Sequence, residues 1–224
     1  MKKVNGKLLL FVVSFMFGIF LINSCTHDDE IVILPENIYE YPLDKVSMTD
    51  GFNFDKTHSS VRWETAYLGS SALLTGRFNA FEFTLEGFEA DKPESTAITG
   101  KVTLSSVNTG EPGRDGGCLL GTFGTDVSDE ATFVSTSVDK DGQGGYEIIG
   151  NLNFHGITSP VTGTLEYVGT TYFDENSGIN GAPLNVAGFI IRFQINAISV
   201  FGLDTHNIGD AVTVIASGQF KQPL

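Results

Sequence analysis

Cysteine, tryptophan and basic residues are scarce in this chain of 224 residues, which has two Cys, one Trp and 13 Lys and Arg against 27 Asp and Glu. The formal net charge is −14 at pH 7. Binding to a phosphate backbone needs clustered Lys and Arg, so this composition argues against a nucleic acid as the partner. Two cysteines cannot build a disulfide framework, and the fold must therefore rest on its own hydrophobic core.

The first 25 residues are typical of an export signal. Three lysines precede an apolar run from Leu8 to Ile22, which is short for a membrane-spanning helix of ~20 residues, and the small Ser24 precedes Cys25. The segment resembles a bacterial lipoprotein signal. That resemblance implies removal of residues 1–24 and attachment of a diacylglyceryl group and a further acyl chain such as palmitate to Cys25. An uncleaved membrane anchor is the alternative.

Cleavage before Cys25 would remove three lysines and no acidic residue, leaving 10 basic against 27 acidic side chains and a net charge of −17. We expect residues 25–50 to form the lipidated N-terminus and a tether, and residues 51–224 to form one domain in the cell envelope, anchored at the outer membrane on its periplasmic or surface face. The acidic cluster Asp28–Glu30 resembles a surface-export signal of Bacteroidetes lipoproteins, or is simply a solvated part of the tether. Cys118 is expected to be a small buried residue.

From Gly51 onward the sequence has the alternating pattern of β-strands, and no window of a dozen residues shows a helical period. On the first strand Val61, Trp63 and Thr65 share one face. The pattern predicts eight strands, at residues 61–67, 76–85, 97–107, 131–138, 145–154, 161–170, 184–200 and 211–220.

Breaks in this pattern predict the local turns. Phe78 has the opposite parity to Phe81, which indicates a bend near Asn79. Hairpins are expected at residues 142–145 and 156–160, and a short helix at Glu111–Gly121. Eight antiparallel strands can form a two-sheet sandwich or a barrel. Their length favours the barrel, since ten residues span ~33 Å.

Several motifs, in order, resemble the YceI-like family of bacterial proteins. Residues 54–63 read Phe-Asp-Lys-Thr-His-Ser-Ser-Val-Arg-Trp, and residues 150–161 read Gly-Asn-Leu-Asn-Phe-His-Gly-Ile-Thr-Ser-Pro-Val. Between and after them come Gly76-x-Phe78-x-x-Phe81, Ser106–Gly110, Arg114-Asp115, Phe133-x-Ser135-Thr136, Gly188-Phe189, Phe201-Gly202 and Ile208–Val212. The resemblance runs from Phe52 to Phe220. It implies an all-β, antiparallel, eight-stranded lipocalin-like barrel with one short helix that binds polyisoprenoid lipids.

The chain departs from the family pattern at polar positions. The second histidine after the first strand is missing, the usual Arg-Asp-x-His-Leu is Arg114-Asp115-Gly116-Gly117-Cys118-Leu119, and the usual Arg-Ser-x-Phe-Gly lacks its arginine before Phe201. These departures fall on polar positions, so they are compatible with the barrel but put the family's usual headgroup or ligand in doubt.

The resemblance predicts a non-enzymatic carrier whose cavity takes an isoprenoid-like lipid or a quinone, with no cofactor and no metal. The aromatic residues expected to line that cavity, or simply to fill the core, are Trp63, Phe81, Phe83, Phe133, Phe154, Phe189 and Phe193. For His58 we expect a structural hydrogen bond with Asp55 or Arg114. Two other functions stay open: a surface adhesion module with an exposed apolar patch, and a hydrolase with Asp55 and Asp115 as a carboxylate pair.

Overall fold

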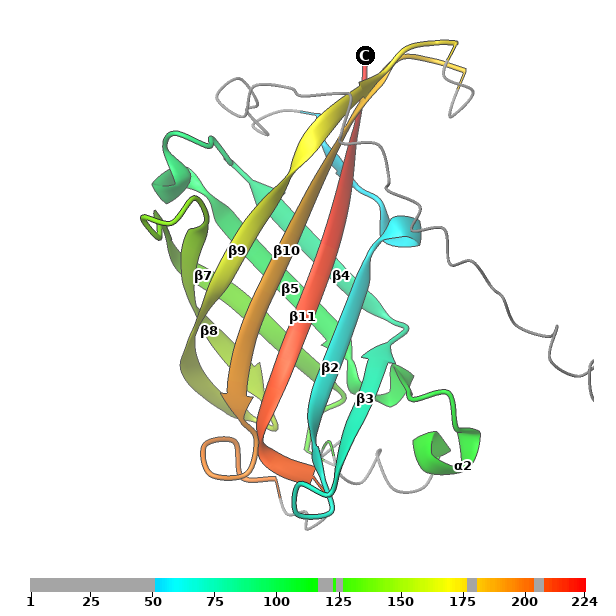
Figure 1. The fold of residues 1–224 in the computed structure, drawn as a ribbon, viewed down its shortest axis with the longest axis vertical. Coiled ribbons are helices and arrows are strands. Elements are labelled where there is room, and N and C mark those ends of the chain that lie inside the picture. The colour runs from blue at the N-terminus through cyan, green and yellow to red at the C-terminus, as the bar shows by residue number, and fades with distance from the viewer. Residues whose placement is uncertain (1–50, 117–122, 124–126, 177–180, 204–207) are drawn as a thin grey trace, which may run out of the picture. The chain divides into compact units, whose positions relative to one another are not determined.

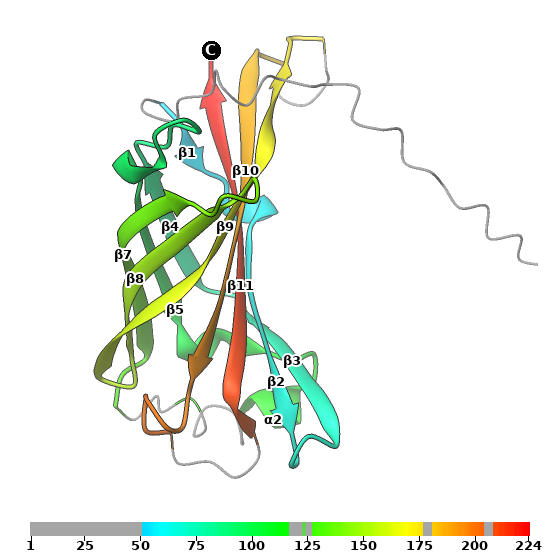
Figure 2. The same cartoon turned by 60° about the vertical axis from the view of Figure 1, so that its left-hand side comes forward.

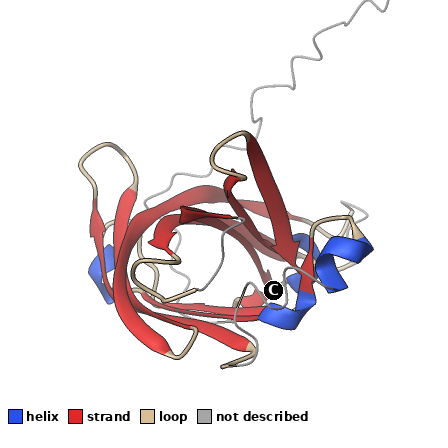
Figure 3. Cartoon of the chain, turned by 90° about the horizontal axis from the view of Figure 1, so that it is seen from below, coloured by secondary structure: helices blue, strands red, loops and turns tan. Residues whose placement is uncertain are grey.

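A single antiparallel sheet curls round a hydrophobic core in the computed structural model of this chain, which describes residues 51–116, 123, 127–176, 181–203 and 208–224 (Figure 1). The hydrogen-bonded order of its strands is β4-β5-β7-β8-β9-β10-β11-β2-β3-β6, and β1 pairs with the end of β11. Seen along its length, the sheet forms a ring of strands (Figure 3). An all-β, antiparallel, barrel-like fold is thereby confirmed.

The strands differ greatly in length. Their bounds are β1 Asn53–Phe54, β2 Ser60–Tyr67, β3 Ala72–Phe78, β4 Phe81–Glu86, β5 Ala97–Thr103, β6 Val107–Asn108, β7 Glu130–Lys140, β8 Tyr146–Phe154, β9 Ile157–Phe173, β10 Leu184–Asn196 and β11 Ile208–Pro223. Single helical turns stand at Lys56–His58, Pro93–Ser95, Leu104–Ser106 and, as α2, at Pro112–Arg114. None of the helices in these described segments is long and apolar enough to cross a membrane.

The prediction of eight strands was wrong in number, because the described residues form eleven. One predicted strand is two: β3 ends at Phe78 and β4 begins at Phe81, and both phenylalanines are buried on either side of the bend expected near Asn79. Two further strands, β1 and β6, have two residues each, too few to show an alternating pattern.

Two predicted boundaries also need correction. The turn between β8 and β9 consists of His155 and Gly156 alone, both with positive φ, so Pro160 lies inside a strand and not in the hairpin. Strand β10 ends at Asn196, because residues 197–201 form turns. The predicted helix begins with Pro112 in its first turn, as expected, but residues 117–122, including Cys118, lie outside the described part of the chain, as do residues 1–50 with Cys25.

Alternation along the strands places the core inside the curl of the sheet. On β8, every second residue is buried, namely Tyr146, Ile148, Gly150, Leu152 and Phe154, while the residues between them are not. Val61, Trp63 and Thr65 on β2 follow the same rule and confirm the predicted inward face. Each strand thereby contributes one apolar face to a common interior.

The sheet leaves a seam, since β4 stands at one end of its hydrogen-bonded order and β3 with β6 at the other. Near the bend, Asn79 N donates to Ser106 O at 3.0 Å and Thr103 N donates to Ala80 O at 2.9 Å. Strand β1 lies near β4 at the other end of the seam (Figure 2). Their side chains pack across it, with the ring centroid of Phe54 5.3 Å from that of Phe83. This part of the wall is therefore joined by aromatic contacts.

Candidate apolar binding cavity

The interior contains an apolar cavity of about 100 Å³. Strands β2, β3, β4, β5, β7, β8, β10 and β11 all contribute to its wall, so it lies within the curl of the sheet. Its aromatic lining residues are Trp63, Phe78, Phe83, Phe123, Phe133, Phe154 and Phe193, and its aliphatic ones include Val61, Ile98, Val102, Leu104, Leu152, Ile191, Ile195, Val212 and Val214. A cavity with this lining favours an apolar occupant over water, which needs two to four polar partners.

Two inward-facing glycines make room for the large rings. The indole of Trp63 lies over Gly76, its cross-strand partner, so closely that a Cβ at Gly76 would come within 2.4 Å of Trp63 Cζ2. The ring of Phe133 lies over Gly150 in the same way, also at 2.4 Å from the position of a Cβ. Because each ring occupies the space that a neighbouring side chain would take, the middle of the interior is left partly open.

A second void of about 20 Å³ adjoins the cavity. The two share Phe83, Ile98, Ile191 and Ala216 in their walls, and the second void is also lined by Phe189 and Phe220. Phe83 is only partly buried and belongs to the seam.

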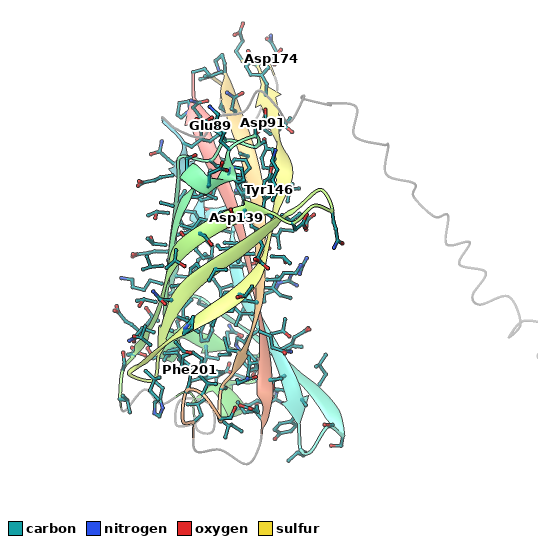
Figure 4. The ribbon with its side chains drawn as sticks, turned by 90° about the vertical axis from the view of Figure 1, so that its left-hand side faces the viewer. Glu89, Asp91, Asp139, Tyr146, Asp174 and Phe201 are labelled. Carbon is teal, nitrogen blue, oxygen red and sulfur yellow. The ribbon has the colours of Figure 1, made fainter. Side chains whose placement is uncertain are left out.

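One end of the barrel is closed by aromatic packing. Phe88, which is fully buried, follows β4 and packs its ring 4.9 Å from Phe189, 5.1 Å from Tyr167 and 5.5 Å from Tyr146. Burial raises the pKa of both tyrosines further above neutral pH. Tyr146 and its neighbour Asp91 mark this end of the barrel and Phe201 the other (Figure 4).

The structure brings five of the seven aromatic residues expected at the site into the wall of the main cavity, namely Trp63, Phe83, Phe133, Phe154 and Phe193. Phe189 lines the adjoining void instead. Phe81 lines neither and packs its ring 5.6 Å from that of Phe83.

The sequence-based prediction left out several lining residues. Ile191 and Val212 share the inward parity that was already evident on their strands, so strand alternation could have identified them. Gly100 also lines the cavity, opposite Phe133 on β7, but a glycine carries no hydropathy signal. Phe123 lies outside any strand, and its contact with Trp63, at 5.2 Å between ring centroids, follows no sequence pattern.

Asp55 is the centre of a polar cluster that fixes the segment after β1 against β11. Its side chain is 10% exposed and accepts hydrogen bonds from Lys221 Nζ at 2.6 Å and Gln219 Nε2 at 3.2 Å. His58 Nδ1 lies 2.7 Å from Asp55 Oδ2, one of the two partners predicted for His58. Asp55 Oδ1 accepts from Thr57 N and so caps the helical turn Lys56–His58. Burial alone would raise the pKa of Asp55, but the contacts with Lys221 and His58 outweigh it and lower the pKa. This cluster holds Phe54 at the seam.

We expect the stability of the domain to depend on the charge of Asp55. Because the pKa of this carboxyl is lowered from 3.8 on folding, its contribution to stability is present above pH 4 and is lost as the pH falls through the folded-state pKa. Asp55→Asn should lower the free energy of unfolding at pH 7 by about 1–3 kcal/mol. Urea unfolding at pH 7 and pH 3 measures this. The difference between wild type and variant should shrink at pH 3, and a constant difference would contradict the assignment.

A carboxylate pair of Asp55 and Asp115 finds no support in their contacts. Asp115 Oδ1 accepts from Thr109 N at 2.9 Å and from Thr109 Oγ1 at 2.7 Å, a turn that shares no residue with the Asp55 cluster. The backbone N–H groups of Arg114 and Asp115 both donate to Glu111 O, so Arg114 and Asp115 belong to the short α2 region. Within the described ranges, no group of three His, Cys, Asp or Glu side chains is arranged to hold a metal ion.

Sequence comparison identifies bacterial relatives of this chain. A UPF0312 protein of Shewanella sp. strain ANA-3 is 35% identical over 113 residues, which are 50% of this chain and 58% of the relative. The chain therefore matches little more than half the length of that relative. A UPF0312 protein of Staphylococcus aureus strain USA300 is 31% identical over 149 residues, covering 65% of this chain and 78% of the relative.

Solved structures share the fold, and a family model covers the barrel except for the last residues of β11. BcnA of Burkholderia cenocepacia has a TM-score of 0.60 at 19% identity, covering 75% of this chain and 99% of its own. A polyisoprenoid binding domain from Saccharophagus degradans, implicated in plant cell wall breakdown, has a TM-score of 0.50 at 17% identity, covering 77% and 99%. The YceI-like domain model matches residues 52–220. The chain thus belongs to the YceI-like family, as its motifs indicated.

Proposed function

We propose that this protein binds an apolar isoprenoid-type lipid inside its barrel and acts as a carrier, not as an enzyme. The observation that carries the proposal is the cavity with aromatic and aliphatic walls at the centre of the sheet. Its lining favours a hydrocarbon with branching methyl groups, which pack well on aromatic rings. The polyisoprenoid binding of the Saccharophagus degradans domain, which has the same fold, supports this class of ligand.

The size of the cavity limits how a long lipid would bind. An engineered apolar cavity of ~150 Å³ takes up benzene, so the main void here has room for about one five-carbon isoprene unit. Burying five carbons gains about 4 kcal/mol at ~0.8 kcal/mol each, which corresponds to millimolar affinity before any cost of ordering. A tail that binds tightly must therefore extend further. The adjoining void, whose wall includes Phe83 and Phe189, lies in the direction in which the tail could extend within the barrel.

Native mass spectrometry of the purified protein tests the proposed function. We expect adducts with added undecaprenol or a long-chain quinone, retained at low collision energy, and no adduct with a soluble sugar of similar mass. A protein that remains empty with every polyprenol and quinone at micromolar concentration would overturn the proposal, since a carrier needs at least micromolar affinity.

We also infer that the chain is a lipoprotein, anchored through Cys25 in the cell envelope at the outer membrane. The support is the N-terminal pattern of lysines, a short apolar run and Ser24 before Cys25. Radioactive palmitate should label the wild-type chain in growing bacteria and should not label Cys25→Ala. Cys118→Ala is the matched control and should be labelled normally. Equal labelling of Cys25→Ala and the wild type would contradict the anchor.

A further inference from the structure

Exposed apolar side chains gather at the end of the barrel opposite the aromatic closure formed by Phe88. Nine large hydrophobic residues are exposed in the described part of the chain, and five of them lie at this end. We call these five the apolar rim: Leu68, Leu73, Val127, Ile157 and Val200, which are 57%, 66%, 55%, 40% and 40% exposed. Exposed apolar residues that lie singly need no explanation, but a cluster at one end indicates a contact surface.

Strand pairing places the rim residues together at one end. Leu68 and Leu73 flank the hairpin between β2 and β3, and the last residue of β2, Tyr67, pairs with Ile208 at the start of β11. A Cβ at Gly156, in the turn before Ile157, would lie 3.1 Å from Val127. A Cβ at Gly202, in the turn that contains Val200, would lie 3.7 Å from Ile157 Cδ1. The described parts of these hairpins lie together at the foot of Figure 1.

Apolar contacts connect the rim with the cavity. Phe154 lines the cavity and its ring lies 5.6 Å from that of Phe201, which is buried beside Val200. His155 Nδ1 lies 2.9 Å from Phe201 O and ties the turn before Ile157 to this segment. The rim is therefore the outer part of an apolar path that begins at the cavity wall.

The acidic groups near the rim are engaged in local hydrogen bonds: Asp129 accepts from Ser105 N and from the Ser105 hydroxyl, each at 2.7 Å. Asp210 accepts hydrogen bonds from Ile198 N, Ser199 N and the Ser199 hydroxyl, contacts that lower its pKa and turn its charge toward the backbone. The rim segments 67–73, 127–129, 155–158 and 197–203 contain no Lys or Arg. Attraction to acidic lipid headgroups, worth about 1 kcal/mol per basic residue, is therefore missing, and contact must rest on apolar burial.

We propose that the apolar rim docks on a lipid bilayer, with its side chains in the interfacial region of uncharged phospholipids. Five exposed side chains on four separate segments offer far less than the ~800 Å² per partner of a stable protein interface, whereas shallow insertion into lipid needs no matching surface. Docking at this end places the apolar path from the cavity against the acyl chains. The proposal deepens the proposed function, but bilayer contact can be measured whether or not the cavity holds a ligand.

Quenching by brominated lipid tests the docking in the full-length chain. Leu73→Trp places a reporter on the rim, and Val168→Trp places one at a similarly exposed position, 58%, in the middle of β9. Both retain Trp63 as the same buried background, and tryptophan suits an exposed strand position. In phosphatidylcholine vesicles with brominated acyl chains we expect the Leu73→Trp signal to fall at least twice as far as that of Val168→Trp, with little dependence on salt.

Other outcomes would overturn the proposal. Equal quenching of the two reporters would show that the rim does not contact acyl chains. A blue-shifted Leu73→Trp emission that grows with protein concentration and ignores brominated lipid would assign the rim to a second copy of the chain. Native mass spectrometry of the same preparation reports ligand in the cavity separately, so a failure of docking and a failure of lipid binding are distinguishable.

Discussion

Gly100→Ile is expected to lower the affinity for a polyprenol at least tenfold without lowering stability. Gly100 lines the cavity and shares its inward face with Ile98. A Cβ at this position would meet Phe83 Cδ1 at 3.5 Å, an ordinary contact. The remaining atoms of the isoleucine side chain would then occupy the void, which has room for about five carbons. Replacing a glycine inside a strand also removes a cost of about 0.5–1 kcal/mol.

Titration of polyprenol, followed by native mass spectrometry, and urea unfolding measure the two effects. Thr164→Ile is the matched control, because Thr164 is exposed on the outer face of β9 and the same side chain there adds nothing to the interior. We expect the control to bind like the wild type. A Gly100→Ile protein that is folded and binds with unchanged affinity would mean that the ligand does not occupy this cavity.

The sequence specified the strands better than it specified how they close. Alternation on β2 and β8 identified the inward faces, and the change of parity between Phe78 and Phe81 located the bend, because these signals are local. The pairing of Phe54 in β1 with Phe220 in β11 was not predictable. A two-residue strand has no period, and its position depends on contacts with residues far along the chain.

The candidate site was likewise predicted only where its contacts are local in the sequence. Asp55 was one of the two partners expected for His58, the other being Arg114, and the structure shows the bond with Asp55. The ion pair of Asp55 with Lys221 was not predicted, because it joins distant parts of the sequence. Strand alternation indicated that Phe133 and Phe193 face the interior. Alternation does not tell whether their rings fill the interior or leave a void. That depends on neighbours such as Gly150, which lets Phe133 lie flat against the wall and leaves the void beside it.

Trp63→Ala should be the most destabilising single substitution proposed here. The side chain is 2% exposed, packs against Phe123 and lines the cavity. Its removal would enlarge an existing void, and truncation of a buried Trp costs about 3–5 kcal/mol, a large part of the 5–15 kcal/mol of a typical domain. Trp63→Phe should cost much less, since it keeps a ring and removes Nε1, a buried donor without a partner in the described residues.

A double-mutant cycle of Trp63 and Gly76 tests the position of the indole in the cavity wall. Gly76→Ala places a Cβ about 2.4 Å from Trp63 Cζ2, so in the wild-type background it must displace the indole and should cost about 1–3 kcal/mol. In the Trp63→Ala background the obstacle is gone, and the same substitution should be neutral or stabilising. The two costs should therefore differ by more than 1 kcal/mol in urea unfolding, a coupling expected only of residues in direct contact. Additive costs would mean that the indole does not lie on Gly76. The lining of the cavity would then differ from the one described.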